Sequence, residues 1–109
     1  MYPISKQENF VTNVDQLQEL SEDIGLAYRS LRKAVDGYGP LDEKQRHLIL
    51  IAGFAAQRNE GGFRVHCIRA VESGATLAEV EQTVLLMLGT SLGVAPVIDA
   101  LRWAHEELK

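Results

Sequence analysis

Apolar residues recur every three to four positions along most of the chain, which is the spacing of an α-helix. A first apolar series begins at about Asn13 and ends at residues 36–40, where the sequence Asp-Gly-Tyr-Gly-Pro is typical of a helix end. Its members are Val14, Leu17, Leu20, Ile24, Ala27, Leu31 and Ala34. Gly25 weakens a helix by about 1 kcal/mol relative to alanine but does not have to break it. The pattern therefore predicts one long helix that starts near Asn13.

The next apolar segment is hydrophobic around most of a helical circumference. Asp42 and Gln45 fit a capping box ahead of a helix over about residues 43–58. Within it, residues 48–56 are all apolar or glycine. A domain this small cannot easily cover such a helix on every side, so the pattern indicates burial against a neighbouring subunit.

A third segment places an imidazole and a thiol on an apolar helix face. Residues 58–62 predict a break, and Gly74 supplies the left-handed residue that ends the helix after it. The face between them consists of Phe63, His66, Cys67, Ala70 and Val71, at positions i, i+3, i+4, i+7 and i+8. Spacing alone favours a structural role for this histidine over a role in a site.

The remainder of the chain predicts two more helices. Thr76 and Glu79 form a capping box before an apolar helix that runs to about Leu88. A kink or loop follows over residues 89–96, and Pro96 suits the first turn of a final helix. No segment alternates with period two, so we expect an all-α fold of about five helices. Residues 13–109 are expected to form a single domain after an extended or mobile lead-in over residues 1–12.

Composition and charge exclude several classes of protein. The chain has 109 residues, of which 46% are hydrophobic and 24% charged, an ordinary globular balance. The net charge is −4 and no basic run exceeds Arg32-Lys33, which argues against a nucleic-acid partner. No stretch approaches the roughly 18 apolar residues of a membrane span, and the N-terminus lacks the features of a signal peptide. With one cysteine and no internal disulfide, we expect a soluble cytoplasmic protein.

The three histidines do not form a metal-binding pattern. His47, His66 and His105 are not spaced i, i+4 from one another, so no metal site is expected, and His105 is predicted to be a solvated surface residue. A hairpin that turned about Glu60 would offset the imidazoles of His47 and His66 by several residues. Their contact would then require a different packing or a neighbouring subunit.

The thiol and the arginines are expected to be mostly structural or solvated. Successive helical side chains point about 100° apart, so the neighbours Cys67 and His66 do not imply a nucleophile pair, and a small buried hydrophobe is the favoured role of Cys67. Four arginines lie before and along the two middle helices, and most are expected at solvated edges. One or two of them could hold an anionic substrate through a bidentate contact to a carboxylate. They are Arg46, Arg58, Arg64 and Arg69.

The sequence from the central helix into the next one resembles a known family signature. The residues that carry the resemblance are His66, Ala70, Gly74, Ala75, Thr76, Glu79 and Val80, in the pattern His-x-x-x-Ala-x-x-x-Gly-Ala-Thr-x-x-Glu-Val. They resemble the carboxymuconolactone decarboxylase family, which shares its fold with the alkyl hydroperoxidase AhpD. The resemblance covers roughly residues 40–105 and implies small helical subunits that assemble into homo-oligomers, trimers or hexamers.

The redox branch of that family carries a glutamate and then Cys-x-x-Cys-x-x-x-His. With His66 as the histidine, the cysteine positions fall at Asn59 and Gly62 and the glutamate position at His47. A hydroperoxidase needs one thiolate to attack the peroxide and another to resolve the product. By this resemblance, the chain supports such a reaction only through Cys67 and an external thiol.

The decarboxylase branch lacks the cysteine pair and resembles this chain more closely. It implies cofactor-free decarboxylation or proton transfer on a small anionic lactone or carboxylate, with His66 as general acid and His47 as a second catalytic residue. The implied substrate-binding residues are Arg46, Arg58 and Glu60. Two alternatives stay open: an AhpD-like hydroperoxide reductase that uses Cys67, and a non-catalytic oligomeric binding protein on the same fold.

Overall fold

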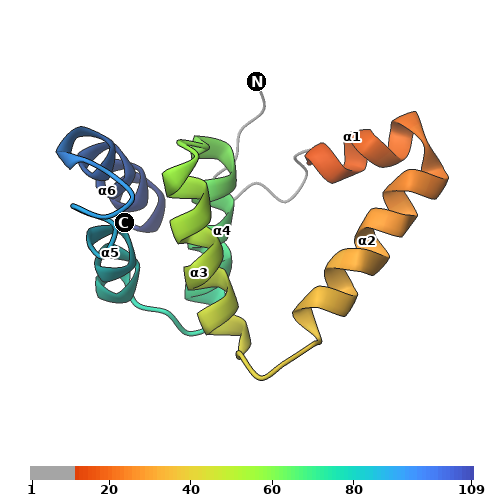
Figure 1. The fold of residues 1–109 in the computed structure, drawn as a ribbon, viewed down its shortest axis with the longest axis horizontal. Helices are drawn as coiled ribbons and strands as arrows, with labels where there is room; N and C mark the ends of the chain where they lie inside the picture. Colours follow the sequence, from red (N-terminus) through yellow and green to blue (C-terminus); the bar gives the residue numbers. More distant parts are fainter. Residues whose placement is uncertain (1–11) are drawn as a thin grey trace. The chain divides into compact units, whose positions relative to one another are not determined.

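The chain is all-helical, as the sequence predicts. A computed structural model describes residues 12–109, so all but the last residue of the predicted lead-in lies outside the described residues. Six helices and no strand occur in the described range (Figure 1). They belong to two compact units, one that includes residues 12–40 and one that includes residues 41–109. That residues 13–109 form a single domain stays a prediction.

The first unit contains two helices where the apolar pattern predicts one. Helix α1 spans Asn13–Leu20 and α2 spans Glu22–Asp36, with an extended residue, Ser21, between them. The prediction of a single helix is wrong because Ser21 is an N-cap: its hydroxyl accepts a hydrogen bond from the Ile24 N–H at 3.3 Å. Gly25 has a different role from the one expected, since a Cβ there would overlap the backbone and side chain of Gln18. It allows α1 and α2 to approach each other closely.

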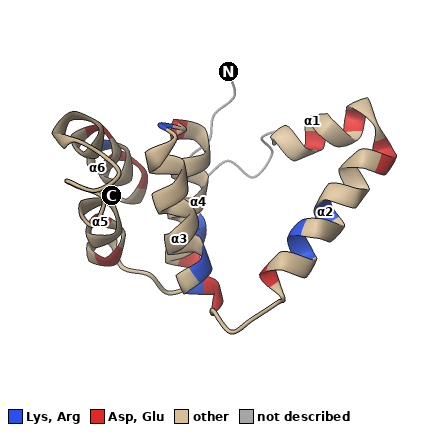
Figure 2. Cartoon of the chain, in the orientation of Figure 1, with Lys and Arg blue, Asp and Glu red and all other residues tan. Residues whose placement is uncertain are grey.

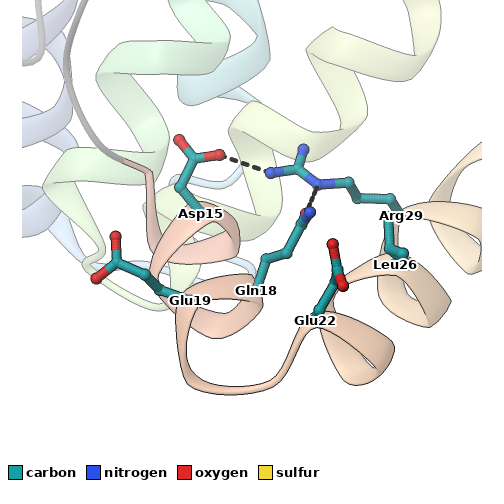
Figure 3. Close-up of a pocket in the computed structure, with 6 residues that line it drawn as sticks. All are labelled: Asp15, Gln18, Glu19, Glu22, Leu26 and Arg29. Carbon is teal, nitrogen blue, oxygen red and sulfur yellow. Dashed lines mark hydrogen bonds and ion pairs between the residues drawn. The ribbon is translucent and has the colours of Figure 1, made fainter.

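Polar side chains join α1 to α2 on the surface of this unit. Arg29 of α2 donates to Asp15 at 2.6 Å and to Gln18 at 2.8 Å (Figure 3). These groups line an open hollow together with Glu19, Glu22 and Leu26. Both members of the Arg29–Asp15 pair are about half exposed, with 46% of each side chain accessible, so solvent screens the attraction.

The second unit is built on a hairpin of two helices with two more packed against it. Helices α3 (Glu43–Ala56) and α4 (Glu60–Glu72) lie side by side, and α5 (Leu77–Leu85) and α6 (Val94–Leu108) complete the bundle (Figure 1). The buried core draws on all four helices. Its members include Ile51, Ala55, Phe63, Cys67, Ala70, Val80, Val84, Val97, Ala100 and Ala104.

Several predicted helix ends of this unit are confirmed, but α5 ends at Leu85 and not at about Leu88, and α6 begins at Val94, inside the predicted loop over residues 89–96. The capping boxes at Asp42 and Thr76 are both formed, each with its side chain on a backbone N–H and a reciprocal bond from the third helical residue. Gly74 takes a φ of 102°, the left-handed value expected after α4. Pro96 lies in the first turn of α6, as predicted.

The connection between α3 and α4 is shorter than the predicted break over residues 58–62. Only residues 57–59 lie outside the two helices, because the Asn59 side chain caps α4 by accepting from the Gly62 N–H at 3.0 Å. Arg58 adopts a left-handed φ of 55°, and the next N–H, of Asn59, donates back to the Phe54 carbonyl at 2.9 Å. This is a Schellman motif with arginine where glycine is usual.

Charges and apolar side chains are both widely exposed. Lys and Arg are dispersed among Asp and Glu, while α1 and α5 carry acidic charges only (Figure 2). Large apolar side chains are exposed in each unit. Examples are Leu20, Ile24, Leu31 and Val35 in the first and Ile49, Leu86, Val94 and Ile98 in the second. None of the helices within residues 12–109 is long and apolar enough to cross a membrane.

The contact between the two hairpin helices gives a first prediction. A Cβ at Gly62 would stand 2.5 Å from the Phe54 ring, whereas a Cβ at Gly53 would meet nothing within 4 Å. We expect G62A to lower the free energy of unfolding by about 1–3 kcal/mol through overpacking. The control, G53A, should raise it by up to about 1 kcal/mol, because alanine favours the helix. Urea denaturation followed by circular dichroism measures both, and a G62A variant as stable as the native protein would contradict this packing.

Candidate functional site

The side chains of His47 and His66 meet within one chain. Their Nδ1 atoms are 3.2 Å apart, and the ring centroids are 5.3 Å apart with the planes tilted by 40°. The sequence leaves this contact open, since a hairpin that turned about Glu60 would offset the two rings by several residues. The turn centres on Arg58 instead. The remaining offset is three residues, about 4.5 Å along the helix axis, and two imidazole side chains can bridge it.

A hydrogen bond between two imidazoles restricts their protonation states. One Nδ1 must carry the hydrogen and the other must present its lone pair. The bond is therefore possible in the neutral pair and in the singly charged pair, in which the extra proton is on an outer Nε2 atom. A second proton would place N–H groups against each other, so the doubly charged pair loses the bond. His47 and His66 thus form one unit that exchanges a single proton while its geometry is maintained.

Two neighbouring side chains position this pair. The Glu43 carboxylate lies 4.0 Å from Nε2 of His47, one helical turn away on α3, and forms an ion pair when that ring is charged. Phe54 stacks on His66 with ring centroids 5.1 Å apart and planes 23° from parallel. The His47 side chain is 16% exposed, so the pair is shielded but reachable from solvent.

Cys67 lies next to His66 in sequence but points into the core. Its side chain is fully buried among the core residues of the second unit. Burial raises the pKa of the thiol to about 12, with a further increase from the negative charge of Glu107 and an opposing effect of Arg64. The thiolate that peroxide chemistry requires is therefore scarce at neutral pH. The predicted role of a small buried hydrophobe agrees with this environment.

Arg64 is held in a network of carboxylates and is not among the arginines at solvated edges. Only 16% of its side chain is exposed, and it bonds Glu60 at 2.9 Å, Glu106 at 2.6 Å and Glu107 at 3.3 Å. Glu107 is 1% exposed, and its Oε2 atom makes no hydrogen bond to the described residues. Glu60, predicted to bind substrate, is thereby engaged with an arginine of its own helix. The i, i+4 spacing of Glu60 and Arg64 is a signal in the sequence, but nothing there indicates Glu107.

The predicted arginine clamp is not brought together in this chain. Arg46 lies in the first turn of α3 and donates to the Leu41 carbonyl at 2.8 Å, while Arg58 follows the C-terminus of the same helix. About 18 Å of helix axis separates the two backbone positions. Arg58 is exposed and close in sequence to Phe54, which stacks on His66.

The third histidine has a partner on α5 and is also partly solvated, with 40% of its side chain exposed. Nε2 of His105 lies 2.6 Å from the Glu81 carboxylate, which joins α6 to α5. A surface hollow along α6 is lined by His105, Ile98, Leu101, Arg102, Glu106 and Lys109. Neither this hollow nor the one between α1 and α2 is lined by His47 or His66. Residues 12–109 contain no group of three or more side chains suited to hold a metal ion.

A model of the carboxymuconolactone decarboxylase family matches residues 22–106. The chain belongs to this family. The match includes helices α2 to α5 and most of α6, and it begins earlier than the resemblance in residues 40–105. No curated protein and no solved structure matches the chain.

The positions that align with the cysteines and the glutamate of the redox motif carry other residues here, and these residues have other roles. Asn59, at the first cysteine position, caps α4. Gly62, at the second, leaves room for the Phe54 ring. His47, at the glutamate position, contacts His66. A histidine pair therefore occupies the place where the redox branch has a glutamate, two thiols and a histidine.

The environment of Cys67 gives a prediction about its reactivity. With a pKa of about 12, about one thiol in ten thousand is ionised at pH 8. We expect the native protein to resist alkylation by iodoacetamide and to react fully once unfolded in guanidinium chloride. Because the thiolate fraction rises with pH, the native rate should increase tenfold per pH unit until the protein unfolds. Mass spectrometry measures the modification, and rapid labelling of the folded protein at pH 7 would contradict the assignment.

Proposed function

We propose that the protein catalyses cofactor-free decarboxylation or proton transfer on a small anionic lactone or carboxylate, with 4-carboxymuconolactone as the first substrate to test. The observation that carries the proposal is the contact of His47 and His66 at 3.2 Å on the central hairpin of a carboxymuconolactone decarboxylase family member. Paired, partly shielded imidazoles supply a proton near neutral pH, which is the step that such chemistry needs from the protein.

The proposed reaction requires one proton delivered to carbon. When the carboxylate leaves as carbon dioxide, the electrons of the broken carbon–carbon bond pass into a dienolate conjugated with the lactone carbonyl. His66 then gives an N–H proton to the dienolate carbon as general acid. As it does so, Nδ1 of His66 takes the shared proton from the charged His47, which lies beside Glu43, so the pair becomes neutral. A proton from solvent then restores the charged pair.

Arg58 is the proposed anchor for a substrate carboxylate. A left-handed arginine costs roughly 1 kcal/mol more than glycine at the same position, and backbone strain of this kind is frequent at binding sites, which supports a functional role for Arg58. It follows Phe54, the residue that contacts His66, by one helical turn. Arg46 and Glu60 belong to the proposed substrate-binding set on the resemblance.

The alternative functions are supported less well. A hydroperoxide reductase would depend on Cys67, whose burial and raised pKa oppose thiolate formation. A non-catalytic binding protein would use the same fold and arginines but would not need the imidazoles to exchange a proton. The effect of the histidines on turnover distinguishes that alternative from an enzyme.

A homo-oligomer, trimeric or hexameric, is part of the same proposal, as is a location in the cytoplasm. The exposed apolar residues of α2, α3, α5 and α6 support an assembly, because surfaces of this kind are usually covered in one. No nucleic acid and no cofactor is proposed as a partner. Multi-angle light scattering measures the mass of the assembly directly, and a monomer at micromolar concentration would contradict this part.

The catalytic role of the pair is tested by turnover of 4-carboxymuconolactone, followed by ultraviolet absorbance. We expect H66A to lower kcat by about 10²–10⁴-fold, the range for loss of a general acid, and H47A to lower it by a smaller factor. H105A is the matched control, since that histidine joins α5 to α6 and lies outside the pair. Equal activity in native protein and H66A, with unchanged helicity, would refute the proposed acid. If neither the native protein nor any variant turns over 4-carboxymuconolactone, this compound is excluded as the substrate.

The proposed anchor gives a prediction in which stability and function change in opposite directions. In R58G, glycine takes the left-handed backbone without a Cβ clash, so we expect the free energy of unfolding to rise by about 0.5–1 kcal/mol. The same variant should raise KM while kcat changes little, because the lost contact holds the substrate equally in the ground and transition states. R69A provides a control arginine on α4. An unchanged KM in R58G would exclude Arg58 as an anchor.

A further inference from the structure

The facing nitrogens of the histidine pair have the separation of two ligands on one metal ion. Imidazole nitrogens bind zinc at about 2.0–2.1 Å, so two of them at the tetrahedral angle are about 3.3 Å apart. The Nδ1 atoms of His47 and His66 are 3.2 Å apart. A shared ion would lie beside the line that joins the two nitrogens, so each ring must rotate to direct its lone pair at the ion while the separation of the nitrogens is kept.

We propose that His47 and His66 chelate a divalent transition-metal ion through their Nδ1 atoms. The neutral pair can do so without losing a proton, because the hydrogen between the rings shifts to an Nε2 atom by a change of tautomer. This inference goes beyond the proposed reaction and does not depend on it, since it rests on the geometry of the two rings. It also revises the expectation from sequence spacing, which compared the histidines along one helix and not across two.

The surroundings of the pair match those of a metal-binding histidine. The Glu43 carboxylate lies 4.0 Å from the outer nitrogen of His47, beyond hydrogen-bond distance. A change of rotamer of this exposed side chain would let it accept from that nitrogen, as carboxylates do beside metal-bound histidines. The Phe54 ring covers one face of His66 at a centroid distance of 5.1 Å. An apolar surface on one side and a carboxylate on the other limit the directions in which the two imidazoles can turn.

The ligand set also selects the class of metal. Two imidazoles suit Zn²⁺, Cu²⁺ or Ni²⁺ and not Mg²⁺ or Ca²⁺, which need oxygen ligands. No third protein ligand joins them within residues 12–109, so water or an anionic ligand would fill the remaining positions. Metal and proton compete for the same nitrogens, so a bound ion would inhibit any acid catalysis by the pair.

Isothermal titration of the untagged, chelator-treated full chain with ZnCl₂ tests the proposal. We expect one ion per chain for the native protein, and affinity at least about tenfold lower in H47A and in H66A. H105A is the control and should bind as the native protein does, and a Mg²⁺ titration should give no binding. Equal affinity in H66A and native protein, or the absence of Zn²⁺ binding to the native chain, would overturn the proposal.

A measurement on the native protein covers the case in which a histidine variant fails to fold. The electron paramagnetic resonance spectrum of one equivalent of Cu²⁺ should show coupling to two imidazole nitrogens, and H105A should give the same spectrum. Coupling to one nitrogen or to none would place the ion elsewhere. Neither measurement involves turnover, so the metal site and the proposed enzymatic function are tested separately. Zinc binding without lactone decarboxylation would refute only the enzymatic function.

Discussion

The close approach of α3 and α4 at Gly62 is the constraint on which the site depends. The Phe54 ring occupies the space that a side chain at residue 62 would take. The same ring stacks on His66, one turn further along α4, so the contact that sets the distance between the helices also orients an imidazole. Asn59 and the left-handed Arg58 make the turn tight enough for this register. His47 then comes within hydrogen-bonding distance of His66 as a consequence of helix packing.

Local signals in the sequence predict the helix ends well and the contacts between helices poorly. The capping boxes at Asp42 and Thr76 and the left-handed Gly74 are visible because each acts within a few residues. Ser21 carries a similar signal, with Glu22 and Asp23 in the first turn after it, but the continuous apolar period on both sides conceals the break. Gly62 illustrates the converse problem: glycine suggests a break, and only the Phe54 ring explains its place inside a helix.

The candidate site shows the same division between local and distant information. Resemblance to the family identifies His66 and the altered redox positions, because these belong to one short motif. The partner of Arg64 at Glu107 and the contact of His47 with His66 join residues from different helices, and no spacing rule predicts them. The pairing of residues across the hairpin depends on where the turn is centred. When the centre moves from Glu60 to Arg58, the offset between His47 and His66 along the helix axis becomes small enough for their imidazoles to meet.

The two sides of α4 carry different kinds of charge: a permanently charged arginine on one side and a titratable histidine on the other. Arg64 faces α6, and two carboxylates of α6 together with Glu60 of α4 hold this cation, which does not lose its proton. Cys67 and Ala70 fill the core next to it. His66 points away from that network, since two residues along a helix correspond to about 200° of rotation. Its partner across the hairpin is the imidazole of His47. Had Arg64 and His66 shared one face, the carboxylates would have favoured a protonated imidazole. Their separation keeps the two imidazoles away from these fixed charges, and the imidazole nitrogens are the atoms that would bind a proton in acid catalysis or a metal ion in its place.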